Sequence, residues 1–230
     1  MSISGETIDY GPCAFMDVYD PKTVFSSIDK FGRYAFSNQP PITKWNLARF
    51  AECLIPRIHK DENEAIKVAS EIIDNFQNIY EEKWLNMMRD KLGLFGKDQN
   101  DQKLINDLLS WMEINNADYT NTFCNLMNVN IEDKKVYEDQ KFMNWVKIWE
   151  KRVLINNNLK EKSLDLMRNT NPTVIPRNHK VEEALNAANK DNIEVMNKLL
   201  NILNKPYSNQ KNIGNYQSLS NDKEYQTFCG

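Results

Sequence analysis

The feature that most constrains the fold is a change in sequence pattern near Thr43. Before Thr43, turn-forming clusters recur at DYGP (9–12), DPKT (20–23) and NQPP (38–41), and such clusters end a helix before it completes three turns. After Thr43, apolar residues recur at intervals of three and four, the spacing of a buried helix face, and strand-like alternation is nearly absent. We therefore expect loops and short elements up to about residue 40, followed by an irregular all-α body.

Capping residues and stop residues give the expected helices approximate limits. The most regular stretch is 61–92, where Asp61 and Glu64 form a capping box and Gly93 supplies the stop. An earlier helix should follow Thr43 and end at Pro56 and His59, with a buried face made by Trp45, Leu47, Ala48, Ala51, Leu54 and Ile55. The remaining helices are expected at about 99–114, 119–128, 138–155, 179–189 and 192–203, the last opened by a capping box of Asp191 and Glu194. The tail from Pro206 is polar and rich in turns.

Composition excludes several classes of protein. With 230 residues, 29 Lys+Arg against 32 Asp+Glu and a formal charge of −3, the chain lacks the basic face that nucleic-acid binding requires. No apolar run approaches the roughly 18 to 20 residues of a membrane span, and the N-terminus has no signal-peptide pattern, so a cytoplasmic protein without membrane partners is expected. Four dispersed cysteines and two histidines, His59 and His179, form no metal-ligand spacing. His179 is therefore not expected to bind metal.

Asp9 is the candidate for chemistry. It follows the β-branched Thr7 and Ile8 and precedes Tyr10 and Gly11, an arrangement that ends a strand and turns sharply. A carboxylate in such a place can hold Mg²⁺ against nucleotide phosphates. A lone Asp-aromatic-Gly is more often a simple Asx turn, so the motif needs support from its context.

That context is a resemblance to a known family. The supporting stretches are MSISGETIDYGPCAFMD (1–17), YDP (19–21), FGRYAFSNQP (31–40), WNLARFAE (45–52), NPTVIPRNHKVEEALNAA (171–188), NKPY (204–207) and the terminal FCG. In this order they closely resemble motifs of the selenoprotein O family, over almost the whole chain. Members of that family have a protein-kinase-like (pseudokinase) fold and transfer AMP from ATP to Ser, Thr or Tyr hydroxyls of proteins.

The resemblance implies that this chain corresponds to the C-terminal half of a family member. Residues 1–60 would be the remnant of a kinase-like C-lobe starting at the DYG turn, 61–205 a helical C-terminal region and 206–230 a polar tail. Asp9 would be a metal ligand and so a cofactor-binding residue for Mg²⁺ and ATP. The glycine-rich loop, the phosphate-contacting Lys with its Glu partner, and a Thr-Asp-Asn segment with the proton acceptor and a second metal ligand would precede Met1.

One carboxylate cannot position a nucleotide, because transfer needs several groups converging on one phosphate. The isolated chain is therefore expected neither to bind ATP tightly nor to transfer AMP. The alternative is a non-catalytic helical interaction module whose partner could be the missing N-terminal lobe. In that case apolar surface should be exposed near residues 1–40.

Two further expectations concern cysteines and structural residues. The family's regulatory disulfide is doubtful here, since Phe25 stands near the position of the partner that Cys229 would need.

Trp145 and Trp149, with Met143, are expected in the core rather than in a ligand cage. Arg49, beside Trp45 and Glu52, is expected to pack against apolar surface, although it could support active-site loops. Arg177 could approach a catalytic loop, and Asn178 is expected to cap a helix.

Overall fold

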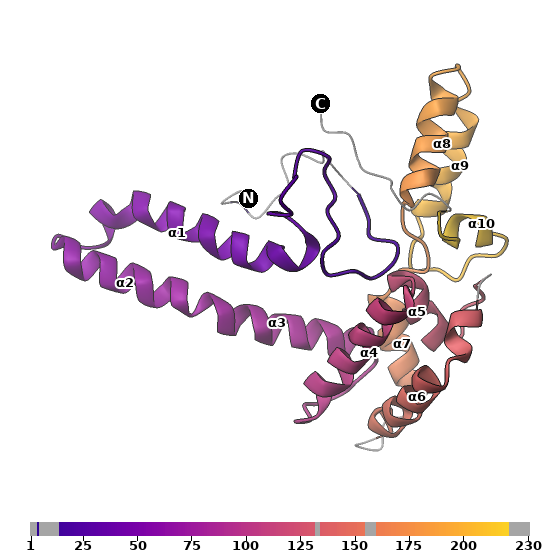
Figure 1. The fold of residues 1–230 in the computed structure, drawn as a ribbon, viewed down its shortest axis with the longest axis horizontal. Helices are drawn as coiled ribbons and strands as arrows, with labels where there is room; N and C mark the ends of the chain where they lie inside the picture. The colour runs from indigo at the N-terminus through magenta and orange to yellow at the C-terminus, as the bar shows by residue number, and fades with distance from the viewer. Residues whose placement is uncertain (1–3, 5–13, 132–133, 155–159, 221–230) are drawn as a thin grey trace. The chain divides into compact units, whose positions relative to one another are not determined.

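The computed structural model describes residues 4, 14–131, 134–154 and 160–220. These residues fall into two compact units, which are described separately. The hairpin unit covers 21–86, and the core unit covers 14–20 and 87–220. Both consist of helices and loops (Figure 1), and no strand is assigned among the described residues. The expectation of a mainly α fold is therefore confirmed.

Two long helices dominate the hairpin unit. α1 (Gln39–Ile58) and α2 (Glu62–Asp74) run side by side in opposite directions, and the 3-10 turn η1 (Phe36–Asn38) leads into α1 (Figure 1). α1 begins before Thr43, with Pro40 and Pro41 in its first turn. The expectation that NQPP forms a loop was wrong, because the first turn of a helix does not use the amide that Pro lacks. Pro56 also lies inside α1 rather than ending it.

The single helix expected at 61–92 is two helices, α2 and α3 (Phe76–Lys91), separated at Asn75. The Asn75 amide donates to the carbonyl oxygens of Glu71 and Ile73, which tightens and ends α2. The start is as expected, since the Asp61 carboxylate accepts the amides of Asn63 and Glu64. The Asp61 amide donates to Nδ1 of His59, in the place that a capping box would give to Glu64.

In the core unit, α4 (Asp101–Asn115) packs against α6 (Gln140–Val153), and α8 (Asn178–Ala188) packs against α9 (Glu194–Leu203). The remaining elements are α5 (Tyr119–Leu126), the 3-10 helix η2 (Lys135–Glu138), α7 (Lys160–Thr170) and α10 (Gly214–Gln217). α7 was not predicted, because its sequence is polar and contributes only Ser163, Leu164 and Met167 to the interior. The last capping box was also wrong. Asp191 takes a left-handed φ of 59°, and the Asn192 side chain accepts the Glu194 amide instead.

Stacked aromatic side chains fill the centre of the core unit. The rings of Trp145 and Trp149 lie parallel with centroids 6.2 Å apart, and both side chains are buried. Their indole Nε1 groups donate to the carbonyl oxygens of Leu104 and Leu92, each at 2.8 Å. The prediction that these tryptophans belong to the core is confirmed, whereas Met143 is 45% exposed.

Gly93 ends α3 as predicted, with a left-handed φ of 67°. The glycine also allows a close approach of α7, since a Cβ atom at this position would lie 2.6 Å from the carbonyl oxygen of Ser163. The same residue therefore serves as a helix stop and as a packing contact.

Asp101, at the start of α4, joins three segments of the core unit. Its carboxylate, fully buried, accepts hydrogen bonds from Nε of Arg89 at 2.6 Å and Nε of Arg152 at 2.7 Å. Arg152 also donates to the carbonyl oxygens of Phe95 and Gly96. Burial alone would raise the pKa of Asp101, but the hydrogen bonds from Arg152, Arg89 and the Asp98 amide lower it overall. The carboxylate is therefore ionised at neutral pH.

The substitution Asp101→Asn should destabilise the core unit by roughly 3–5 kcal/mol at pH 7, because it removes the buried carboxylate that Arg152 and Arg89 both contact. The lowered pKa means that this stabilisation is present above the ordinary pKa of an Asp and is lost as the pH falls through the folded-state pKa. Urea unfolding followed by tryptophan fluorescence should show a difference in unfolding free energy between wild type and variant, and this difference should shrink in acid. A difference under about 1 kcal/mol at pH 7 would contradict the role of Asp101.

Candidate functional site

Asp9, the residue predicted to bind metal, lies outside the described residues, as do Cys13 and Cys229. Within the described part of the chain, no three His, Cys, Asp or Glu side chains gather closely enough to hold a metal ion. The described cysteines are both free thiols, Cys53 exposed and Cys124 buried. The predicted metal ligand and the doubtful disulfide therefore stay predictions.

The described chain resumes after the DYG motif at residue 14, and the segment 14–20 is held in the core unit by Arg177. The Arg177 guanidinium is 1% exposed, and its Nη1 donates to Asp17 at 2.7 Å and to Asp118 at 2.6 Å. Its Nη2 donates to the carbonyl oxygen of Gln217 at 2.9 Å. One buried side chain thus connects the segment after Asp9 with the N-termini of α5 and α8 and with α10.

Backbone hydrogen bonds fix the same segment. The Tyr119 amide donates to the Asp17 carbonyl at 2.9 Å, and the Tyr19 amide donates to the Ala117 carbonyl at 3.0 Å. These bonds form an isolated antiparallel bridge between Val18 and Asp118. Residues 17–19 are therefore fixed in the core unit by backbone hydrogen bonds and by the side-chain bond between Asp17 and Arg177.

Asp118 has two structural roles. Its Oδ1 accepts the Asn121 amide at 2.6 Å and caps α5, while its Oδ2 accepts the bond from Arg177. Burial raises the pKa of Asp118 and is opposed by Arg177. Burial would lower the pKa of Arg177, but Asp118 and Asp17 raise it overall, so the guanidinium keeps its charge. Removing one partner of an ion pair this deeply buried is strongly destabilising, because it leaves the other charge uncompensated.

The cap expected of Asn178 was wrong, while the approach of Arg177 to a catalytic loop stays a prediction. Asn178 is the first residue of α8 rather than its cap, and its amide group donates to the Phe15 carbonyl. Arg177 contacts Asp17, a residue 160 positions away, which spacing could not predict. The available signal was Asp118, which stands directly before an expected helix as an N-cap. Neighbouring His179 has a pKa lowered mainly by burial, and its buried Nδ1 has no hydrogen-bond partner.

The second candidate, in the hairpin unit, is the exposed surface of α1. The Arg49 side chain pairs with Glu52 and lies 5.4 Å from the Trp45 ring centroid, and Arg33 lies 4.8 Å from the same ring. Trp45 is 48% exposed. The expectation that Trp45 lies on a buried face is wrong here, because these cations cover its ring without excluding water.

Lys91 is a buried cation of the core unit with a strongly lowered pKa. Its ammonium is 4.3 Å from the Phe123 ring centroid and 5.2 Å from that of Tyr119, and the residue is 9% exposed. Burial lowers its pKa from 10.5 to about 8, and the nearby Cys124 opposes that shift. Aromatic faces stabilise a desolvated cation only partly, so a charged Lys91 costs stability at neutral pH.

Arg177→Met should destabilise the core unit by about 3–5 kcal/mol, because it leaves the buried Asp118 without a counter-ion. The amides of Tyr19 and Tyr119 should then exchange hydrogen faster by mass spectrometry. Arg168→Met is the matched control, since Arg168 also bonds two carboxylates, Glu161 and Asp165, but is 45% exposed. It should cost less than about 1 kcal/mol. Equal effects of the two substitutions would contradict the assignment.

Lys91→Met should raise the free energy of unfolding by about 1–3 kcal/mol at pH 7, since it removes a buried charge while keeping the stem. Because the folded pKa is about 8 against 10.5 unfolded, the unfolded wild-type chain binds more protons over that interval. The wild type therefore gains stability as the pH rises from about 8 toward 10.5, and the advantage of the variant should shrink. Urea titrations of both proteins at pH 7 and pH 10 measure the difference in unfolding free energy. A difference that stays constant between the two pH values would contradict the lowered pKa of Lys91.

No helix in the described ranges combines the length and apolar character needed to cross a membrane.

Comparison with known proteins shows which family the chain belongs to. The family model described as "Protein adenylyltransferase SelO" matches residues 1–204. A relative from Pelagibacter ubique named "Protein nucleotidyltransferase YdiU" is 59% identical to this chain over 234 residues, which cover 100% of this chain and 48% of the relative. The proteins of the same name from Clostridium botulinum (Okra) and Nitrosococcus oceani are 54% and 48% identical over 233 residues, covering 48% and 47% of their lengths.

The chain therefore spans about half the length of the curated relatives it matches, consistent with the C-terminal half that its motifs indicate. The match of the family model over most of the sequence and the high identities are sufficient for assignment: this chain belongs to the SelO family of protein adenylyltransferases.

Proposed function

We propose that this chain is the C-terminal half of a protein adenylyltransferase that transfers AMP from ATP to a Ser, Thr or Tyr hydroxyl of a protein substrate. The observation that carries the proposal is the match to the family over residues 1–204, which includes the DYG motif at 9–11. The relatives carry the name protein nucleotidyltransferase, which agrees with this class of reaction.

The chemistry explains why half a protein is insufficient. In AMP transfer, the substrate hydroxyl oxygen forms a bond to the α-phosphorus of ATP while the bond from that phosphorus to the bridging oxygen breaks. Pyrophosphate leaves, and the hydroxyl proton passes to a carboxylate base. The enzyme must hold both reactants in line and stabilise the developing charge, which requires several groups around one phosphate.

Asp9 is the residue of this chain that we assign to the metal. The described residues supply no metal centre of their own, and Mg²⁺ binds well only when phosphates and more than one protein ligand act together. Asp9 would therefore share the ion with ligands and an ATP site in the other half of the family polypeptide. When bound, Mg²⁺ would neutralise phosphate charge there.

Arg177 holds the described segment that follows the DYG motif in the sequence. Asp17 is bonded to Arg177 and to Tyr119. Arg177 is thus a positioning residue for residues 14–20 of the core unit in this proposal. The kinase-like C-lobe at 1–60, the helical region at 61–205 and the polar tail at 206–230 are part of the same proposal, as is a cytoplasmic location.

A second candidate function is a non-catalytic helical interaction module. The observation that favours it is the composition of the interior of the hairpin unit, where the described buried hydrophobic residues are Ala35, Ala65 and Ala69. A unit that buries only small side chains by itself is suited to packing against a partner.

AMP incorporation separates the two functions. With ATP labelled at the α-phosphate, the chain alone should give no transfer to a protein substrate. Transfer should appear when this chain is joined to the other half of the Pelagibacter ubique relative, and Asp9→Ala should abolish it.

Asp107→Ala is the matched control, since Asp107 is a half-exposed acid whose partner is Lys103 at the surface of α4, and it should leave transfer unchanged. Transfer by the chain alone, lost in Asp9→Ala, would contradict the inactivity of the half. Transfer that survives Asp9→Ala in the joined protein would contradict the role of Asp9.

A further inference from the structure

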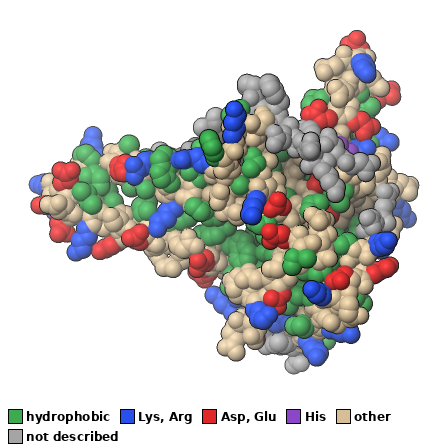
Figure 2. All heavy atoms as spheres, viewed as in Figure 1, with side chains coloured by type: hydrophobic (Ala, Val, Ile, Leu, Met, Phe, Trp, Pro, Cys, Tyr) green, Lys and Arg blue, Asp and Glu red, His purple; other side chains and the backbone are tan. Residues whose placement is uncertain are grey.

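The hairpin unit exposes the side chains that would normally form a core. α1 has no buried residue over its 20 positions, and α2 buries only Ala65 and Ala69. Leu54 is 37% exposed, Ile66 47% and Ile72 66%. Figure 2 shows hydrophobic side chains on the surface of this part of the chain. The core unit, by contrast, buries large aliphatic and aromatic side chains such as Phe123, Phe142 and Ile105.

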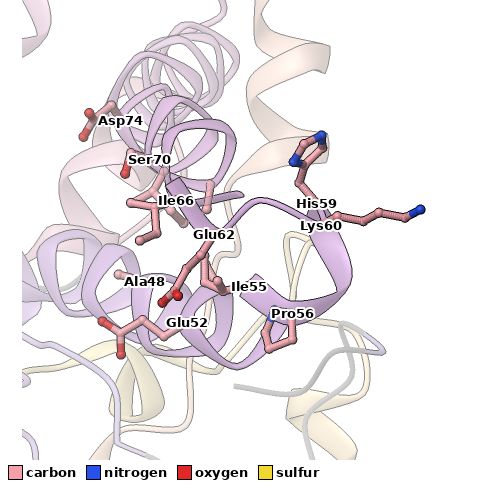
Figure 3. Close-up of a pocket in the computed structure, with 13 residues that line it drawn as sticks. Ala48, Glu52, Ile55, Pro56, His59, Lys60, Glu62, Ile66, Ser70 and Asp74 are labelled. Atoms are coloured by element: carbon pink, nitrogen blue, oxygen red, sulfur yellow. The ribbon is translucent and has the colours of Figure 1, made fainter. Parts of the chain in front are cut away.

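A groove of about 900 Å³ runs between α1 and α2. Its apolar lining consists of Ala48, Ala51 and Ile55 from α1 and Ile66, Ala69 and Ile73 from α2. In Figure 3, Ala48 and Ile55 on one helix and Ile66 on the other lie on the two sides of this groove. Alanine at these positions lets another backbone approach closely, as in tightly packed helix pairs.

Carboxylates border this apolar lining. Glu52 extends from α1, and Glu62 and Asp74 extend from the two ends of α2 (Figure 3). Lys60 and His59 belong to the connection at one end. Glu52 is paired with Arg49 and Asp74 with Lys44, so the groove is apolar along its length and bordered by charged side chains of both signs.

We propose that this groove is the docking surface for an amphipathic helix from the half of the family polypeptide that this sequence does not span. The inference rests on the proposed function for the identity of the partner. An apolar groove between two helices accepts a third helix through side chains spaced at three and four residues. α2 has 13 residues, so the docked helix would contact it over roughly 20 Å, or three to four turns. A basic residue beside its apolar stripe would match Glu62 at the edge of the groove.

The lengths of the relatives support this occupant. They contain about as much polypeptide again as this chain matches, since coverage is 48% of the Pelagibacter ubique protein. Exposed aliphatic side chains occur on both helices, Leu54 on α1 and Ile66, Val68 and Ile72 on α2, and a second half could bury this apolar surface. A second copy of this chain fits less well, because it would bring the same carboxylates to the edge of the groove.

The test uses the unmatched half of the Pelagibacter ubique protein, coexpressed with this chain and carrying an affinity tag. Association is measured by pull-down and then by titration calorimetry. Ile66→Asp places a charge in the groove and should weaken association at least tenfold, because a carboxylate is costly to bury against apolar side chains. Ile114→Asp is the matched control: it lies on α4 of the core unit and is 74% exposed. It should change the affinity less than twofold.

A second measurement does not depend on the separate half folding. In a single-chain fusion of that half to this chain, the amides of α1 and α2 should be protected from hydrogen exchange relative to the chain alone. Ile66→Asp should remove that protection, and Ile114→Asp should not. Circular dichroism of both variants checks that helix content is retained.

Each outcome bears on the proposal. Equal weakening by both variants, or association without any effect of Ile66→Asp, would overturn the placement in the groove. Concentration-dependent self-association of the chain alone, abolished by Ile66→Asp, would assign the groove to a second copy instead. Absence of protection in the fusion would show that no helix docks there. Docking without AMP transfer would leave this inference standing and refute the proposed function.

Discussion

The buried contact of Arg177 with Asp17 and Asp118 determines where the start of the described chain lies in the core unit. Three segments distant in sequence meet at one guanidinium, and all three are also fixed by backbone hydrogen bonds. A charge with 1% exposure is stable only because its partners are in place. The same contact therefore positions the residues after the DYG motif and stabilises the core unit. A substitution at Arg177 should affect both.

The two units show contrasting ways of using the same helical pattern. In the core unit, apolar stripes face one another and aromatic rings stack, with Trp145 and Trp149 also bonded through their indole nitrogens. In the hairpin unit the stripe on α1 faces no comparable partner among the described residues. Periodicity in a sequence indicates that a face is made to be buried, but the chain that buries it need not belong to the same half of the protein.

This difference explains how much could be predicted from the sequence. The helical class, the core position of Trp145, the cap at Asp61 and the stop at Gly93 are local properties and were predicted correctly. The cap of α9 was not, because the Asn192 side chain rather than Asp191 accepts the Glu194 amide. The break at Asn75, where the backbone amide donates to the carbonyl oxygens of Glu71 and Ile73, was not predicted either. Arg177 required knowledge of contacts across 160 positions. The role of Asp9, which lies outside the described residues, stays a prediction.

The tryptophans differ in their contact with water. Trp111, Trp145 and Trp149 are enclosed in the core unit, whereas in the hairpin unit Trp45 is 48% exposed on α1 beside two arginines and Trp84 is half-buried. An indole in contact with water emits at longer wavelengths and is open to a dissolved quencher, and an enclosed one emits at shorter wavelengths. The fluorescence of the intact chain is thus a sum of contributions from both units, and a dissolved quencher should reach Trp45 before the three enclosed indoles.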